Sequence, residues 1–217
     1  MLTLKKVIQT LTTYVWWENI FDRAFALLAL VILSPFLAII TISIRIDTPG
    51  NPLFRQERVG KDGRRFILYK FRSMYVDNDD SQYKAMLRQY VAEGITSNLV
   101  EIHNLVNNPR VTKVGAVLRK TNLDELPQLF NIIKGDMAIV GPRPDIPFAV
   151  EMYQERHRKR FIVKPGLTGL WQVSGRRNMS FEDMVALDID YITKQSLLLD
   201  VKICLLTLVV AMKERSI

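Results

Sequence analysis

An acidic pair, Asp124 and Glu125, lies among basic residues and is the strongest candidate for chemistry in the sequence. Arg119 and Lys120 precede the pair, and Arg143 follows it within the sequence GPRP. Carboxylates surrounded by arginines suggest a divalent cation, because Mg²⁺ takes oxygen ligands and typically bridges one or two carboxylates to substrate phosphates. An aspartate can also be a nucleophile toward phosphorus, as in enzymes that form aspartyl phosphates. The pair therefore favours phosphoryl transfer from a diphosphate substrate.

A structural role without catalysis is the alternative for the same pair. Asn122 is a candidate N-cap, Pro127 falls in or just after the first turn of the predicted helix, and Gly135 can close its C-terminus. Acidic residues in the first turn commonly complement the helix dipole. The surrounding basic residues, and not the pair alone, favour catalysis.

Positive charge is concentrated in the middle third of the chain. The 217 residues include 30 Lys and Arg against 22 Asp and Glu, a net charge of +8. This predicts an anionic partner, which could be a phosphorylated ligand, a lipid surface or nucleic acid. Nucleic acid ranks last because the sequence has no aromatic and basic stacking platform and no recognition helix. The cluster consists of Arg55, Arg58, Lys61, Arg64, Arg65, Lys70 and Arg72.

Composition removes several other classes. With 48% apolar and 24% charged residues, the chain is neither disordered nor a transporter with many spans. The single cysteine, Cys204, excludes an internal disulfide and a metal site built from cysteines. His103 and His157 lie far apart in sequence, which argues against histidine-rich zinc chemistry.

An uncharged segment of membrane length runs from Ala24 to Ile44, between Arg23 and Arg45. Pro35 follows Ser34 near its midpoint, and proline removes a backbone hydrogen bond and clashes with the preceding turn, so we expect a sharp kink. Basic residues on both flanks favour a cytoplasmic position for both ends. A re-entrant helix, which bends and returns, satisfies both observations. A simple spanning helix is the alternative.

Two further segments have apolar faces. Residues 4–15 place apolar side chains at helical spacing, with Lys5 and Lys6 on another face, and predict an amphipathic helix at the membrane interface. Residues 197–212 are too short and too charged to span a membrane comfortably. They form either a buried core helix or a second interfacial helix, and we favour the second.

The remaining pattern predicts a compact α-rich domain. We expect a strand over 66–71, a charged helix over 79–92 that Gly94 ends, and a helix that carries Val114, Val117 and Leu118. The next expected elements are a helix over 147–159 and an extended, glycine-punctuated loop or strand over 164–177.

Five segments, in this order, resemble the bacterial sugar transferase family, the monotopic polyprenyl-phosphate hexose-1-phosphate transferases or phosphoglycosyl transferases. The resemblance covers roughly residues 18–215, although 77–108 is longer than in compact members. It implies an α-rich α+β fold, with a membrane-anchoring region at 1–47 that includes a re-entrant helix. A catalytic domain at 48–217 would face the cytoplasm at the bacterial inner membrane. The segments are FDRAFALLALVILSP, FRQERVGKDGRRFILYKFRSM, LRKTNLDELPQLFNIIKGDMAIVGPRP, KPGLTGLWQVSGR and LDIDYITKQSLLLDVKI.

The resemblance also implies roles for individual residues. Asp124 would be the nucleophile of a catalytic pair with Glu125, and the two carboxylates would bind Mg²⁺, with Glu125 as its main support. The residues that it implies for substrate binding are Lys70, Arg72, Arg119, Arg143, Pro144, Gln172 and Arg176.

The implied reaction has two steps. Asp124 attacks the sugar-bearing phosphate of a UDP-sugar and UMP leaves; polyprenyl (undecaprenyl) phosphate then takes the phosphosugar, as the first membrane step of exopolysaccharide, capsule or O-antigen synthesis. The partners would be UDP-sugar, polyprenyl phosphate and membrane lipid, with a homodimer as one assembly and no nucleic acid. The competing hypothesis is a non-enzymatic, membrane-tethered adaptor that binds anionic lipid.

Several other polar residues have two interpretations. Gln56 and Arg58 could bind substrate or pair with aspartates of the C-terminal half. Asp188 and Asp190 could join a metal site, but structural pairing with basic residues is favoured. His157, in the run RHRKR, is expected to be an exposed surface residue.

Overall fold

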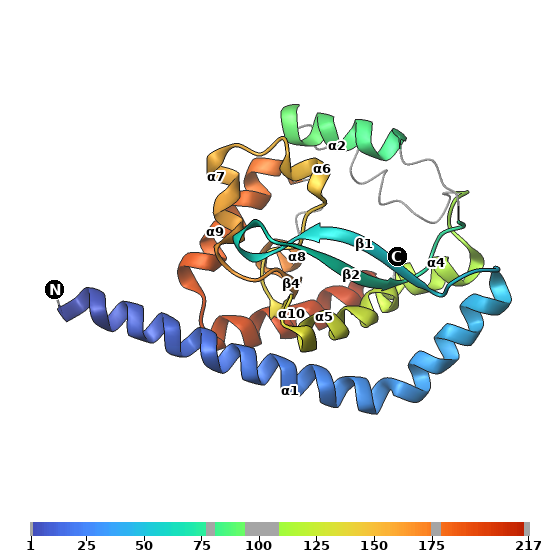
Figure 1. Cartoon of the computed structure of the whole chain (residues 1–217), viewed down its shortest axis with the longest axis horizontal. Helices are drawn as coiled ribbons and strands as arrows, with labels where there is room; N and C mark the ends of the chain where they lie inside the picture. The colour runs from blue at the N-terminus through green and yellow to red at the C-terminus, as the bar shows by residue number, and fades with distance from the viewer. Residues whose placement is uncertain (1, 77–80, 94–108, 175–178, 215–217) are drawn as a thin grey trace.

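A computed structural model describes residues 2–76, 81–93, 109–174 and 179–214. Most of the elements are helical, and two pairs of strands form the sheets, so the predicted α-rich α+β class is confirmed (Figure 1). The elements are α1 (Leu2–Asp47), β1 (Leu53–Val59), η1 (Lys61–Gly63), β2 (Arg65–Phe71), α2 (Ser81–Glu93), α4 (Lys113–Lys120), η2 (Leu123–Gln128), α5 (Leu129–Lys134), β3 (Ala138–Val140), α6 (Pro147–Val150), α7 (Glu155–Arg158), η3 (Lys159–Ile162), β4 (Gly166–Thr168), α8 (Leu170–Val173), α9 (Phe181–Lys194) and α10 (Leu197–Glu214).

Helix α1 continues through Pro35, and Figure 1 shows that it bends along its length. Proline has no N–H to donate to the carbonyl four residues earlier, that of Val31. The Ser34 hydroxyl donates to this carbonyl instead, at 2.8 Å. The portion of α1 from Asn19 to Asp47 is long and apolar enough to cross a membrane, by length and composition. The Ser-Pro pair thus breaks the backbone pattern and satisfies the acceptor that proline leaves.

Helix α1 also forms part of the protein core. Ala26 and Leu30 of α1 pack with Leu68 of β2 and with Leu129 and Ile132 of α5. A second apolar cluster joins the end of α1 to β2 and α4. The helices on either side of the acidic pair, α4 and α5, therefore rest directly on α1.

The two strand pairs have different topologies. Strands β1 and β2 are antiparallel, with Leu53 opposite Phe71 and Val59 opposite Arg65, which confirms the predicted strand at 66–71. Asp62 and Gly63 turn the chain between them in the left-handed region, at φ values of 56° and 75°. Strands β3 and β4 are parallel.

The expected helix over 147–159 is two short helices, α6 and α7, followed by η3. Gln154 separates them with an extended backbone, at φ −73° and ψ 164°. Its N–H donates to the Nδ1 atom of His157 at 3.1 Å, so a new helix begins there. Residues 164–177 also differ from the expectation, because β4 is followed by the single helical turn α8.

The other helix predictions are confirmed where the structure describes them. Helix α2 occupies Ser81–Glu93, and α4 carries Val114, Val117 and Leu118. Gly94 and most of the 77–108 insertion lie outside the described residues, as do the side chains of residues 2–18 on which the N-terminal amphipathic face was predicted.

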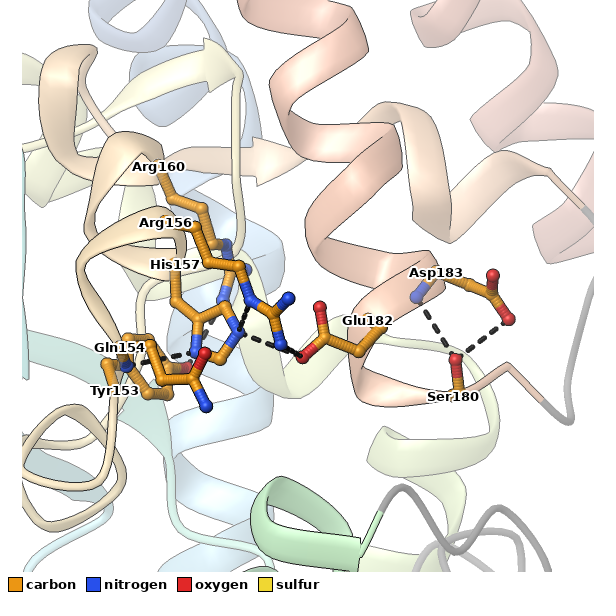
Figure 2. Close-up of polar contacts among 8 residues, drawn as sticks. All are labelled: Tyr153, Gln154, Arg156, His157, Arg160, Ser180, Glu182 and Asp183. Atoms are coloured by element: carbon orange, nitrogen blue, oxygen red, sulfur yellow. Dashed lines mark hydrogen bonds and ion pairs between the residues drawn. The ribbon is translucent and has the colours of Figure 1, made fainter.

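The expectation that His157 is exposed is wrong, because only 2% of its surface is accessible. Figure 2 shows its ring between α7 and the start of α9, where Nε2 lies 2.9 Å from the Glu182 carboxylate. The rings of Tyr153 and Phe181 meet it edge to face, with centroids 5.7 and 5.0 Å away. Residues 157 and 160 are buried while 156, 158 and 159 are exposed, because the helical turn directs every third side chain inward.

Helix α10 exposes much of its apolar surface. Ile203 is fully buried against β3, α8 and α9, whereas Leu198, Leu205 and Leu208 are 81%, 60% and 62% exposed. Helix α10 is therefore not a fully buried core helix, which was one of the two alternatives for residues 197–212. An exposed apolar face of this size is typical of a surface that contacts a partner or a membrane.

Candidate active site

Glu125 is clamped between two cations that come from separate elements. Lys70 on β2 donates to its Oε1 atom at 2.8 Å, and Arg143 of the GPRP loop donates to the same atom at 2.9 Å. The three side chains are 16%, 32% and 17% exposed for Lys70, Arg143 and Glu125 respectively. The fold therefore brings together one acidic and two basic residues that the sequence had proposed for the site.

A tight junction between α4 and η2 places Arg119 close to the acidic pair. Asn122 lies in the left-handed region at φ 56°, where asparagine is tolerated better than most residues, and its carbonyl accepts the Glu125 N–H at 3.2 Å. Asn122 occupies the N-cap position of η2, as predicted, but its side chain makes no capping hydrogen bond. The pair lies in the first turn of a 3-10 helix, and Gly135 ends the following α5 at φ 86°, as expected.

Asn131 fixes the strand that carries Lys70. Its buried amide donates to the Ile67 carbonyl at 2.6 Å and accepts the Tyr69 N–H at 3.1 Å. These bonds join α5 to β2 one residue before Lys70. Sequence analysis missed this residue; the available signal was a polar side chain within the apolar run LFNIIK.

The two carboxylates differ in their electrostatic surroundings. Burial opposes ionisation of Glu125, but the charges of Arg143 and Lys70 outweigh it and hold the pKa of Glu125 well below its usual range. Burial raises the pKa of Asp124, against the opposing effect of Lys70. Among the described residues, no cation forms an ion pair with Asp124 within 4 Å. Glu125 is therefore committed to the clamp, whereas Asp124 is available to react.

Three partly buried cations, Lys70, Arg119 and Arg143, surround Asp124. Burial lowers the pKa of Lys70 and of Arg119, although Glu125 opposes this for Lys70 and Asp124 opposes it for Arg119. Glu125 raises the pKa of Arg143, and burial only partly offsets that effect. Such desolvated positive groups gain stability from a bound anion, which fits a phosphate ligand.

The loop that carries Arg143 is held on both sides. The Val59 N–H donates to the Asp145 carbonyl at 2.9 Å, and Arg58 donates to the Pro144 carbonyl at 3.0 Å. From the other side, Arg160 donates to the Asp145 carboxylate at 2.6 Å. The hairpin and η3 together fix the position from which Arg143 reaches Glu125.

Asp188 is structural, as the sequence favoured. Its Oδ2 lies 2.6 Å from Arg160, and the two side chains are 1% and 0% exposed, whereas Asp190 pairs with Lys194 on the surface. Arg160 thus bridges Asp188 of α9 to Asp145 of the GPRP loop. Sequence analysis missed Arg160, because its run of basic residues looked exposed.

We expect Asp188→Asn to lower the free energy of unfolding by about 2 kcal/mol, since it removes a charge from a buried ion pair while Asp145 still faces Arg160. Urea unfolding in the same detergent measures this difference. Asp190→Asn, on the same helix, is the control and should change stability by less than about 0.5 kcal/mol, because exposed pairs contribute little. Equal effects for the two variants would contradict the assignment.

The other predicted substrate-binding residues have different surroundings. Arg72 is buried and donates to the carbonyls of Thr48 and Pro49 at 2.7 and 2.6 Å, at the end of α1. Pro144 is buried, and Gln172 is half-buried on α8. Arg176 lies outside the described residues.

The carboxylate oxygens of Asp124 and Glu125 are of the kind that Mg²⁺ takes as ligands. Both bonds of the clamp end on Oε1 of Glu125, which leaves Oε2 and the Asp124 carboxylate as hard oxygen ligands. Within the described part of the chain, no group of three or more acidic, histidine or cysteine side chains could hold a metal alone. Mg²⁺ sites in proteins commonly use one or two carboxylates together with substrate phosphates and water.

The chain belongs to the bacterial sugar transferase family, whose model matches residues 13–214. It is 41% identical over 196 residues to galactosyl transferase CpsE of Streptococcus agalactiae, across 90% of this chain and 42% of that protein. It is 39% identical over 194 residues to the UDP-glucose:undecaprenyl-phosphate glucose-1-phosphate transferase of Escherichia coli, across 86% and 38%.

The extent of these matches differs among relatives. The chain spans about two fifths of CpsE and of the E. coli enzyme. The exopolysaccharide production protein ExoY of Sinorhizobium fredii is 39% identical over 188 residues, which cover 87% of this chain and 82% of that protein. The matched region therefore accounts for most of one relative and for part of the others.

Proposed function

We propose that the chain is a polyprenyl-phosphate sugar-1-phosphate transferase that moves hexose-1-phosphate from a UDP-sugar to undecaprenyl phosphate and releases UMP. The observation that carries this proposal is the Lys70–Glu125–Arg143 clamp beside Asp124, which has no ion-pair partner among the described residues. The names of the relatives support it, because they refer to galactosyl transfer and to glucose-1-phosphate transfer onto undecaprenyl phosphate.

The first step forms a bond between an Asp124 carboxylate oxygen and the sugar-bearing phosphorus. The bond from that phosphorus to the oxygen that bridges to the UMP phosphorus breaks, and UMP leaves with the electron pair. In the second step an oxygen of undecaprenyl phosphate attacks the same phosphorus and displaces Asp124. A covalent intermediate suits two anionic substrates, because they occupy one small site in turn.

The surrounding residues position and neutralise charge. Arg119 is near Asp124, and Arg143 and Lys70 already hold Glu125, so the attacked phosphate would meet fixed cations without a large rearrangement. Mg²⁺ bound by Asp124 and Glu125 would supply further neutralisation of the phosphate charge. Phosphoryl transfer depends mainly on such positioning and electrostatics.

A membrane setting fits the lipid acceptor. We propose that α1 enters the inner membrane as a re-entrant helix from the cytoplasmic face and that the exposed face of α10 lies at the interface. The support is the apolar stretch Asn19–Asp47, the Ser-Pro break within it and the exposed leucines of α10. The residues that bind the nucleotide would then face the cytoplasm.

The purified chain should release UMP from UDP-glucose or UDP-galactose when Mg²⁺ and undecaprenyl phosphate are present, with the sugar recovered in the lipid fraction. Without the lipid acceptor, UMP release should stop at about one equivalent per enzyme, because the covalent intermediate cannot turn over. Counting UMP with and without acceptor tests both steps. A protein that binds anionic vesicles but releases UMP from no UDP-sugar would support the adaptor hypothesis instead.

A further inference from the structure

A small recess lies between α2 and the GPRP loop, next to the clamp. Its volume is about 50 Å³. Arg58, Tyr83, Tyr90, Asp145 and Tyr153 form the polar and phenolic part of its wall, and the other lining residues are apolar. Figure 1 shows α2 beside α6, the helix that follows the loop. A recess of this size holds about three water molecules. It is too small for a whole sugar ring but large enough for the hydroxyl groups along one edge of a ring.

Arg58 connects this recess to the catalytic residues. Its Nη1 atom donates to the Pro144 carbonyl, one residue after Arg143, and its Nη2 atom donates to Gln56 at 2.6 Å. Its Nε–H is buried and has no hydrogen-bond partner among the described residues. Leaving a buried donor unpaired is unfavourable, so a ligand hydroxyl that accepts from it would gain affinity.

Tyr83 of α2 lines the same recess. The side chain is half-buried, its ring packs against the apolar cluster of α6 and α9, and its hydroxyl makes no hydrogen bond within the described structure. Burial lowers the pKa of Arg58 and of Arg119, and Tyr83 is close enough to contribute a smaller opposing effect to each. Glu125 is the main cause of the raised pKa of Arg143, and Tyr83 makes a smaller contribution in the same direction. Tyr83 therefore lies where the recess meets the cations of the site.

We propose that this recess receives the hydroxyl-bearing edge of the donor hexose, and that Tyr83 and Arg58 determine which hexose is accepted. The inference rests on the proposed function, in which Asp124 attacks the phosphate that carries the sugar. The hexose is bonded directly to that phosphate, whereas uridine lies one phosphate further away. The recess begins at Asp145, two residues after Arg143, so it is within reach of the sugar, and its charged and phenolic groups suit hydroxyls.

Tyr83→Phe tests this inference, because it removes only the hydroxyl. We expect kcat/KM for the preferred UDP-hexose to fall about tenfold, which is the usual effect of losing one hydrogen bond to a ligand hydroxyl. We also expect the ratio of kcat/KM between UDP-glucose and UDP-galactose to change. Competitive inhibition by UMP should change less than about twofold. Gln89→Ala, on the exposed face of the same helix, is the matched control and should preserve the wild-type ratio.

The outcomes separate this inference from the proposed function. An unchanged donor ratio in Tyr83→Phe would overturn the sugar recess, and so would an equal loss of UMP inhibition, which would assign the recess to the nucleotide. Arg58→Lys keeps the charge but removes the Nε donor, and it should shift the donor ratio in the same way. A wild-type enzyme that releases no UMP from any UDP-hexose would overturn the proposed function, and this inference with it.

Discussion

Asp124→Asn should reduce UMP release by at least about 10³-fold, because an amide is a poor nucleophile toward phosphorus and cannot form the acyl-phosphate bond. The variant keeps the size and shape of the side chain, so its fold should be preserved. The measurement is UMP release with UDP-hexose, Mg²⁺ and undecaprenyl phosphate. Intact mass spectrometry of enzyme mixed with donor alone should find a phosphosugar adduct on the wild type and none on the variant.

Asp62→Asn is a suitable control for Asp124→Asn. Asp62 is exposed at the tip of the hairpin at φ 56°, a backbone conformation that asparagine also adopts readily. This variant should retain wild-type activity.

Since the pKa of Asp124 is raised by burial, turnover should also rise with pH as this carboxyl ionises. An active Asp124→Asn variant, or an adduct found on another residue, would remove Asp124 as the nucleophile.

Glu125→Gln should lower kcat by about 10³-fold, the upper range for the loss of one electrostatic group from an active site. Glutamine preserves an oxygen that can accept from Lys70 or Arg143, but it removes the negative charge that the two cations share. The cations are then free to move from the position where they meet the phosphate. Steady-state kinetics at several Mg²⁺ concentrations measures the effect, and the concentration for half-maximal activity should rise.

The exposed Glu57 supplies the matched control for this substitution. Its ion pair with Arg65 is about half exposed on each side, so Glu57→Gln should change activity and stability little. A Glu125→Gln variant with wild-type kcat would show that the clamp does not contribute to turnover. A change in kcat with no change in the Mg²⁺ requirement would leave Glu125 in the clamp but remove it from metal binding.

Local patterns were sufficient to predict much of the site. Asp124, Glu125, Arg119 and Arg143 lie within 25 residues, and their residue types alone indicated phosphate chemistry. The strand at 66–71, the helices α2 and α4 and the apolar segment of α1 were also recognisable, because each follows a short-range periodicity or a run of one residue type.

Contacts between distant residues were not predictable in this way. Lys70 meets Glu125 across 55 positions, whereas Arg72, just after the end of β2, contacts Thr48. Side chains alternate along a strand, but the sequence does not say which face of β2 meets η2. Arg160 and Asn131 were missed for a related reason, since their partners on α9, the GPRP loop and β2 are defined only by the tertiary fold.

The two apolar clusters that α1 shares with β2, α4 and α5 make α1 and the region that carries the candidate site one cooperative unit. A fragment that begins at residue 48 would leave Leu68, Leu129 and Ile132 without their α1 partners, so it should aggregate and not behave as a soluble enzyme. A lipid or detergent that changes the position of α1 would therefore change the thermal unfolding midpoint of the whole molecule. The choice of lipid or detergent, and not only the presence of substrates, should therefore affect how long the purified protein keeps its activity.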